Sequence, residues 1–262
     1  MTKNALASFS VDVEKDLHTG KNQGITTGIP KILDILAKHK IKATFFVTGE
    51  VLKGYQKQIK SVFEQGHEIG IHGYTHKRFD SMTSNQKEEE IYKSVSLYKK
   101  LFKIQPKGFR APQHSIDKET LSILEKNGLK YDSSVCSKNL ILLRHLLKKD
   151  SSKLEIMRNF FSKSKSYKIS KALIEVPRSS PLLALGGFEL KVYPYFLLVF
   201  ILNLHSLFKI PLNFVMHSWD MIDTPGSKTS KICPSKKFEI ILDSFIKEMK
   251  KRYTFVKMER LA

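Results

Sequence analysis

The first half of the chain alternates between short β-rich runs and segments with helical periodicity, and this alternation limits the folds open to it. Strands are predicted at 6–13, 42–47, 67–71 and 107–110. Helices are predicted at 25–39, 51–65, 84–102 and 117–127. Such βα units build a mainly parallel sheet or barrel, so we expect an α/β fold with its chemistry at the carboxyl ends of the strands.

The second half of the chain is less regular. A Lys- and Ser-rich segment at about 137–170 predicts a helix with an irregular insertion. Further strands are predicted at 173–176 and 213–217, and further helices at 194–207 and 236–251. No linker separates these parts, so we expect residues 1–262 to form one domain.

Basic residues outnumber acidic ones, because 45 Lys and Arg against 25 Asp and Glu give a formal net charge of +20. Such an excess favours anionic surroundings such as nucleic acid, anionic lipid or an acidic substrate, or it is a solvated Lys-rich surface. The sequence contains no helix-turn-helix, zinc-finger or RNA-binding motif. We therefore expect no specific nucleic-acid partner.

The cysteines and the N-terminal segment indicate the cellular compartment in which the protein resides. Cys136 and Cys233 are too few for a disulfide framework, and neither belongs to a CxxC pair. Reduced thiols are typical of cytosolic proteins. Residues 1–14 lack the apolar run of a secretory signal peptide. These features predict a cytoplasmic protein.

Two carboxylates, Asp12 and Glu14, end the first predicted strand, and their spacing places them on one face of it. A divalent metal would neutralise one such carboxylate and leave the other as a general base. His72 and His76 follow a later strand at a spacing of four, which predicts one face of a helical turn and two ligands for one metal. Together these residues predict a catalytic metal site with an open position for water.

Arg110 and His217 also come at the ends of predicted strands. Arg110, fixed by the nearby Pro112, is suited to pair with a carboxylate and to set its pKa and orientation; the alternative is a surface arginine. His217 is followed by the only tryptophan, Trp219. A histidine there could shuttle a proton near neutral pH, and the alternative is a buried structural histidine.

Five stretches occur in the order found in one known family: SFSVDVE, KATFFVTGEV, GHEIGIHGYTHKRF, GFRAPQHSID and FVMHSWD, within residues 7–220. In them the sequence resembles the polysaccharide deacetylase family, the NodB-homology domain or carbohydrate esterase family 4. The similarity is greatest to the branch found beside bacterial surface-polysaccharide genes. The resemblance implies a distorted (β/α)7 barrel of the NodB-homology type. It also implies metal-dependent removal of N-acetyl groups from an amino-sugar-containing glycan or glycolipid precursor.

The resemblance further implies a metal site. Members of the family bind a divalent metal, usually zinc, through an aspartate and two histidines, and His72 and His76 match the two histidines. The family's paired aspartates correspond to Asp12 and Glu14, with Asp12 as general base and Glu14 as metal ligand. The reverse assignment stays open. Cobalt, nickel, manganese or iron could occupy the same ligands.

Three residues of the stretch GFRAPQHSID match functional positions of the family. Arg110 corresponds to the arginine that holds the catalytic aspartate. Pro112 and Gln113 correspond to the segment whose backbone N–H holds the oxyanion, at a position where the family often has tyrosine. A backbone donor does not depend on that side chain, so the oxyanion role is expected to persist.

His217 matches the histidine that serves as general acid, and Trp219 beside it is assigned to the substrate. The acidic partner of His217 is left open among Asp220, Asp223 and Glu175. The family's fourth motif, with an Asp and a Trp, is not recognisable in this sequence.

Two alternatives remain for the function. Relatives of this fold cleave other non-peptide C–N bonds, so a different amide hydrolase is one alternative to a deacetylase that acts on N-acetylated sugar. A catalytically inactive carbohydrate-binding module is the other, and it is favoured if Glu14 cannot complete the metal site.

The apolar helix at 194–208 has two interpretations. Helices that are apolar all round are usually buried, which predicts packing against the sheet. An interfacial helix would instead insert its aromatic side chains into a membrane surface while the basic surface meets anionic lipid. That interpretation predicts peripheral contact with the inner face of the cytoplasmic membrane and suits a lipid-linked sugar.

Overall fold

The structure is a computed structural model that describes residues 5–16, 19–137, 161–179 and 183–262. The strands of the described residues are β1 Ala5–Val13, β2 Thr44–Val47, β3 Glu68–Ile71, β4 Gly108–Phe109, β5 Tyr131–Asp132, β6 Cys136–Ser137, β7 Tyr167–Lys168, β8 Ile174–Glu175, β9 Arg178–Ser179, β10 Leu212–His217 and β11 Tyr253–Phe255. The main sheet has the order β10–β1–β2–β3–β4–β5–β8–β7, and β11 also pairs with β1.

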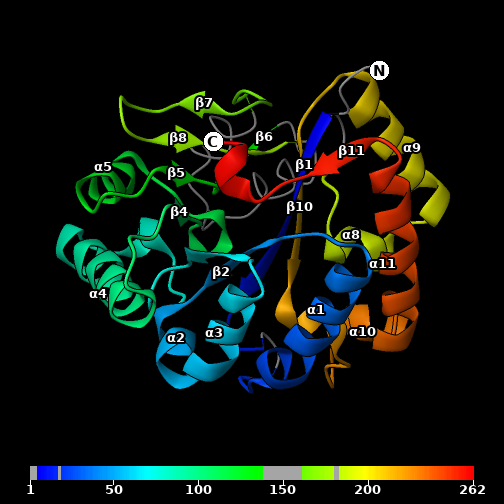
Figure 1. Ribbon diagram of the computed structural model, residues 1–262, viewed down its shortest axis with the longest axis horizontal. Coiled ribbons are helices and arrows are strands. Elements are labelled where there is room, and N and C mark those ends of the chain that lie inside the picture. Colours follow the sequence, from blue (N-terminus) through cyan, green and yellow to red (C-terminus); the bar gives the residue numbers. More distant parts are fainter. Residues whose placement is uncertain (1–4, 17–18, 138–160, 180–182) are drawn as a thin grey trace.

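Neighbouring strands from β10 to β8 are all parallel, and β7 is antiparallel to β8. This run of parallel strands curls into part of a barrel, and helices surround it (Figure 1). The predicted distorted (β/α)7 fold is therefore confirmed. A separate pair, β6 and β9, lies off the main sheet.

The α-helices of the described residues are α1 Ile29–Lys38, α2 Gly49–Gly54, α3 Gln56–Glu64, α4 Ser84–Phe102, α5 Lys118–Lys126, α8 Gly187–Val192, α9 Tyr195–Leu207, α10 Lys228–Ile232 and α11 Ser235–Lys250. The bounds of α4 are those predicted, because Thr83 and Gln86 form a capping box that defines its start. The helix predicted at 51–65 is instead two helices, since Tyr55 adopts a non-helical backbone conformation between them. Residues 138–160 of the Lys- and Ser-rich segment lie outside the described residues.

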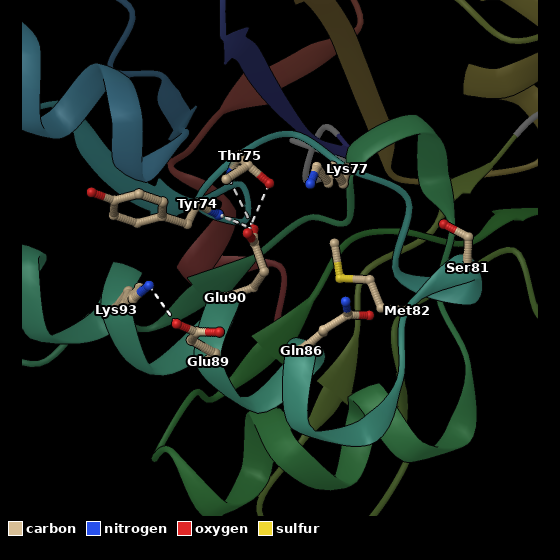
Figure 2. A pocket seen from close by; sticks show the side chains of 9 residues that line it. All are labelled: Tyr74, Thr75, Lys77, Ser81, Met82, Gln86, Glu89, Glu90 and Lys93. Atoms are coloured by element: carbon tan, nitrogen blue, oxygen red, sulfur yellow. Dashed lines mark hydrogen bonds and ion pairs between the residues drawn. The ribbon is translucent and has the colours of Figure 1, made fainter.

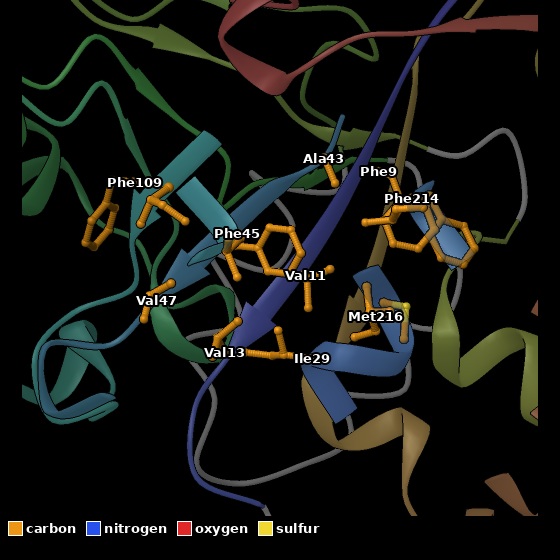
Figure 3. Close-up of a cluster of buried hydrophobic side chains, with 14 of the residues drawn as sticks. Phe9, Val11, Val13, Ile29, Ala43, Phe45, Val47, Phe109, Phe214 and Met216 are labelled. Atoms are coloured by element: carbon orange, nitrogen blue, oxygen red, sulfur yellow. The ribbon is translucent and has the colours of Figure 1, made fainter. Parts of the chain in front are cut away.

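From Ala7 to Val13, strand β1 is buried on both of its faces, although its residues alternate between apolar and polar. The apolar face packs into the main core, where the Phe9 ring stacks on that of Phe214 with centroids 4.9 Å apart (Figure 3). Ser8, Ser10 and Asp12 point to the opposite face and are at most 4% exposed. A strand buried on one apolar and one polar face can therefore hold charged groups in place at its carboxyl end.

Helix α9 is not buried all round, so the first interpretation of the 194–208 segment is only half right. Leu198, Ile201 and Leu202 face the core, whereas Phe196 and Phe200 are 76% and 55% exposed. In the described part of the chain, no helix combines the length and the apolar character needed to cross a membrane.

Candidate active site

Glu14 lies between the two imidazoles at the carboxyl edge of the sheet. It directly follows β1, and His72 directly follows β3. Its Oε2 atom is 3.3 Å from Nε2 of His72 and also contacts Nε2 of His76. The ligand atoms of the three residues all lie within 4.8 Å of one another. The structure thus brings together the three residues that the sequence nominated as metal ligands.

This group fits a divalent cation. Oε2 of Glu14 is buried and makes no hydrogen bond of ordinary geometry. Nδ1 of His72 lies 2.7 Å from the carbonyl oxygen of Arg110, which fixes the ring as an Nδ1–H donor and leaves Nε2 free to act as a ligand. Two imidazole nitrogens and one carboxylate oxygen form a donor set that suits zinc and related metals.

Burial by itself raises the pKa of Glu14, but the imidazoles of His72 and His76 beside the carboxylate outweigh it and hold the pKa well below its usual range. The carboxyl group is therefore ionised at neutral pH, as a ligand must be.

The segment between the two histidines is an irregular loop, so the predicted helical turn is wrong. Gly73 and His76 both have left-handed backbone conformations, with φ of 68° and 61°. The loop nevertheless brings the two rings to a centroid separation of 5.2 Å. A Cβ atom on Gly73 would lie 3.2 Å from the Phe79 ring, so both the conformation and the tight packing favour glycine there.

Asp12 has a different partner from Glu14. Its Oδ1 atom is 2.7 Å from Nη1 of Arg110, and both side chains are buried. Burial raises the pKa of Asp12, but the Arg110 guanidinium and the nearby imidazoles outweigh it, so the pKa is lowered. The arginine predicted as a partner for a carboxylate therefore lies beside Asp12, at the end of β4.

Arg110 is itself held by a polar network inside the barrel. Its Nε donates to the carbonyl oxygen of Ser133 at 3.0 Å, and Nη1 also donates to Oγ of Ser10 at 3.1 Å. Asn213 from β10 donates to Oγ of Ser133. Sequence reasoning did not identify these residues, because the network depends on contacts between β1, β4, β10 and the segment after β5.

His217 reaches the same cluster from the end of β10, where its Cα pairs in register with that of Asp12. Its Nε2 is 3.9 Å from Oε1 of Glu14. Its Nδ1 is 3.8 Å from Oδ2 of Asp220, which in turn forms a buried ion pair with Lys191. Burial lowers the pKa of His217, but the carboxylates of Asp220 and Glu14 outweigh it and raise the pKa to about 9.

Asp220 is therefore the carboxylate beside His217 among the three candidates. Asp223 instead accepts hydrogen bonds from the backbone N–H and hydroxyl of Ser235. Glu175 lies in β8 and accepts from the backbone N–H of Val135.

The remaining nominated residues lie around this cluster. The Trp219 ring stacks on His217 with centroids 4.3 Å apart, and its Nε1 donates to Oε1 of Glu14 at 3.4 Å. Pro112 and Gln113 form a short 3-10 turn just after Arg110, with Gln113 exposed and left-handed at a φ of 53°. Their roles at an oxyanion and a substrate stay predictions.

A cavity of 440 Å³ adjoins the loop that carries His76. It lies between that loop and α4, and the loop residues Tyr74, Thr75 and Lys77 form one wall of it (Figure 2). None of the three nominated metal ligands lines it. The cavity is therefore distinct from the Glu14 cluster.

Fold and cluster together define an α/β barrel that carries a candidate divalent-metal centre at the carboxyl edge of its strands. Residues 18–131 match the family model for polysaccharide deacetylase. Over these residues the chain is similar to the polysaccharide deacetylase family, which confirms the resemblance of its motifs.

Two relatives are named for deacetylation of peptidoglycan. The peptidoglycan deacetylase of Helicobacter pylori (strain ATCC 700392 / 26695) is 36% identical over 150 residues, which are 52% of this chain and 51% of that one. The peptidoglycan-N-acetylmuramic acid deacetylase PdaA of Bacillus subtilis (strain 168) is 34% identical over 103 residues, which are 36% of this chain and 39% of that one. The chain thus spans about half or less of the length of these relatives.

Two solved structures share the fold. One, described as a "putative polysaccharide deacetylase" from Mycobacterium smegmatis, matches with a TM-score of 0.71 and 16% identity over 100% of this chain and 90% of that one. The other, a CE4 family pseudoenzyme from Bacillus anthracis, matches with a TM-score of 0.57 and 14% identity over 99% of this chain and 66% of that one. At these identities the likeness extends to the fold alone.

Proposed function

We propose that this protein is a metal-dependent carbohydrate N-deacetylase. One observation carries the proposal: Glu14 converges with the Nε2 atoms of His72 and His76, while Asp12 forms an ion pair with Arg110. The relatives named for peptidoglycan deacetylation support the same class of reaction. The proposed substrate is an N-acetylated amino sugar within a glycan or glycolipid precursor of a surface polysaccharide.

In this proposal Glu14, His72 and His76 hold the cation, with zinc as the preferred metal for this donor set. When bound, such a cation polarises the amide carbonyl and lowers the pKa of water. Asp12 is ionised and fixed by Arg110, so its carboxylate can accept a proton from the attacking water.

The same proposal gives His217 the role of general acid. Its raised pKa keeps it protonated at neutral pH, so it can donate a proton to the departing amine. The backbone N–H of Gln113 is proposed to donate to the oxyanion, and the Trp219 ring to contact the sugar. The products are acetate and a free amino sugar.

The test is metal content together with acetate release from N-acetylated oligosaccharides. We expect about one zinc per chain in the wild type, loss of metal and turnover in His72→Ala, and retention of both in His39→Ala. His39 is a suitable control because it is a buried histidine that pairs with Asp243 in another part of the molecule. Absence of metal from the wild type would contradict the proposal.

Metal without acetate release would favour one of two alternatives. A hydrolase of another non-peptide C–N bond would still turn over a different amide substrate. An inactive carbohydrate-binding module would bind glycan without turnover, and the CE4 pseudoenzyme shows that the fold occurs without activity. Glycan binding and a panel of amide substrates distinguish the two.

A second proposal concerns location: the protein binds the inner face of the cytoplasmic membrane through α9. The proposal is supported by an exposed apolar stripe on one side of the helix. It consists of Phe196, Phe200 and Leu207, which are 76%, 55% and 73% exposed. The net charge of +20 would add attraction to anionic lipid.

Flotation with anionic and neutral vesicles tests the location. We expect the wild type to float with anionic vesicles at low salt, and the double variant Phe196→Ser/Phe200→Ser to remain at the bottom. Tyr92→Ser is the matched control, since Tyr92 is an aromatic residue of α4 that is 65% exposed. Equal flotation of wild type and double variant would contradict the proposal.

A further inference from the structure

The loop that carries both histidines is anchored on two sides by hydrogen bonds to neighbouring helices. On one side, the first backbone N–H groups of α2 donate to the loop, from Gly49 to the Gly73 carbonyl at 2.9 Å and from Glu50 to the Tyr74 carbonyl at 3.0 Å. These are helix N-terminal donors that have no partner within their own helix. The loop carbonyls therefore have partners in α2.

On the other side, one side chain of α4 accepts the loop's donors. Oε2 of Glu90 accepts from the backbone N–H of Tyr74 at 2.7 Å and of Thr75 at 2.9 Å. Oε1 of Glu90 accepts from the hydroxyl of Thr75 at 2.7 Å. Figure 2 shows the carboxylate pointing from the helix into the bend of the loop. Both of its oxygens are thus engaged by the two residues that precede His76.

This loop needs such an anchor, because its backbone conformation is not one that the chain adopts readily. Gly73 and His76 are both left-handed, and for His76 that conformation carries a steric penalty. Charged acceptors form stronger hydrogen bonds with backbone N–H groups than neutral acceptors do. A carboxylate that binds two consecutive N–H groups can hold the bend that brings His76 to Glu14.

We infer that Glu90 is a positioning residue for the candidate metal centre, because it fixes the bend of the loop that places His76 against Glu14. Glu90 touches neither the cation site nor the reacting atoms, so it acts through the loop. Outer partners of metal ligands commonly affect metal affinity roughly 10–100-fold. The inference rests on the proposed metal site.

The test of the inference is the zinc affinity of the metal-free protein, measured by calorimetry in the presence of a competing chelator. We expect Glu90→Ala to bind zinc roughly 10–100-fold more weakly than the wild type. Glu90→Gln keeps a carbonyl oxygen for the two N–H groups, so its affinity should lie closer to the wild type. Glu89→Ala and Glu89→Gln are matched controls, because Glu89 precedes Glu90 on α4 and pairs with Lys93. Both controls should bind zinc as the wild type does.

Amide hydrogen exchange in the metal-free protein gives a readout that does not depend on metal. The N–H groups of Tyr74 and Thr75 should exchange slowly in the wild type and in the Glu89 variants, faster in Glu90→Gln and fastest in Glu90→Ala. A global loss of structure would instead accelerate exchange throughout the sheet. If Glu90→Ala does not fold, Glu90→Gln against Glu89→Gln decides the question by the same two measurements.

The outcomes separate this inference from the proposed function. Equal zinc affinity and equal exchange in the Glu90 and Glu89 variants would overturn the positioning role. A wild type that binds no zinc would overturn the proposed metal site, and exchange at Tyr74 and Thr75 would still decide whether Glu90 holds the loop. Weaker zinc binding and faster exchange only in the Glu90 variants would support both.

Discussion

Arg110 and Asp12 form a buried ion pair with 2.7 Å between Nη1 and Oδ1, and this pair gives the two nearby carboxylates different partners. Asp12 is bound to the guanidinium, whereas Glu14 faces the two imidazoles. Replacement of Asp12 and replacement of Glu14 should therefore have different effects on metal binding and turnover.

Glu14→Gln is expected to lose both metal and turnover. Asp12→Asn is expected to keep its metal but to lose roughly 10²–10⁴-fold in kcat, the usual contribution of a general base. Metal analysis and acetate release on both variants check this. Loss of metal from Asp12→Asn, with metal kept in Glu14→Gln, would support the reverse assignment.

Replacement of Arg110 should destabilise the fold because the charge of the buried Asp12 carboxylate then has no partner. In Arg110→Met the Asp12 carboxylate stays buried without its partner, which typically costs about 3–5 kcal/mol of unfolding free energy. Urea unfolding measures the change. The double variant Arg110→Met/Asp12→Asn should recover part of it, and a double variant no more stable than Arg110→Met would argue that the lost hydrogen bonds dominate.

The rate of deacetylation should fall as the pH rises through the pKa of His217. Because that pKa is raised to about 9, the imidazolium is present at neutral pH and is lost at alkaline pH. Asp220→Asn removes the carboxylate that favours the charged form, so the alkaline limb should move roughly 1–3 pH units toward neutrality. The control is Asp223→Asn, whose native partner is Ser235. If the alkaline limb of the pH–rate profile lies at the same pH in both variants, Asp220 does not raise the pKa of His217.

His205 should make the fold less stable in acid. It is fully buried in α9, neither ring nitrogen has a hydrogen-bond partner among the described residues, and burial lowers its pKa from 6.5 to about 4. The unfolded chain therefore binds the proton first, so stability is retained above pH 6.5 and falls as the pH drops toward 4.

The loss of stability is about 3.5 kcal/mol at most, because a pKa lowered from 6.5 to about 4 corresponds to about 1.4 kcal/mol per pKa unit. His205→Leu should lose less stability than the wild type between pH 7 and 4.5, as measured by urea unfolding of the metal-free protein at both values. His67 contributes in the same range, because burial lowers its pKa to about 4 as well. An unchanged pH dependence in His205→Leu would mean that His205 is not buried as a neutral ring.

Long periodic segments of this chain could be predicted from the sequence, whereas several of the two-residue strands could not. Helix α4 has the predicted bounds because its nineteen residues keep their periodicity and begin at a capping box. Strands β5, β6 and β9 have two residues each and were not predicted, since so short a run carries no period. Strand β5 lies between β4 and β8 in the main sheet, whereas β6 and β9 pair with each other across about 40 residues of sequence.

The candidate site likewise has residues that could be predicted from the sequence and residues that could not. Spacing along the chain nominated His72 with His76 and Asp12 with Glu14, because the members of each pair are close in sequence. The choice of Asp220 beside His217 needed the turn after β10, and Glu90 was missed because it reads as an ordinary surface carboxylate of a helix. Its role depends on how α4 packs against a loop about fifteen residues earlier.

The register that places Asp12 beside His217 joins two strands that are about 200 residues apart in the chain. On the ribosome, where about 5–20 residues are added per second, β10 is made roughly 10–40 s after β1. Throughout that interval the β10 side of β1 has no strand to pair with. A nascent chain released before β10 is complete would offer that open edge to other chains, and edge pairing of this kind leads to aggregation.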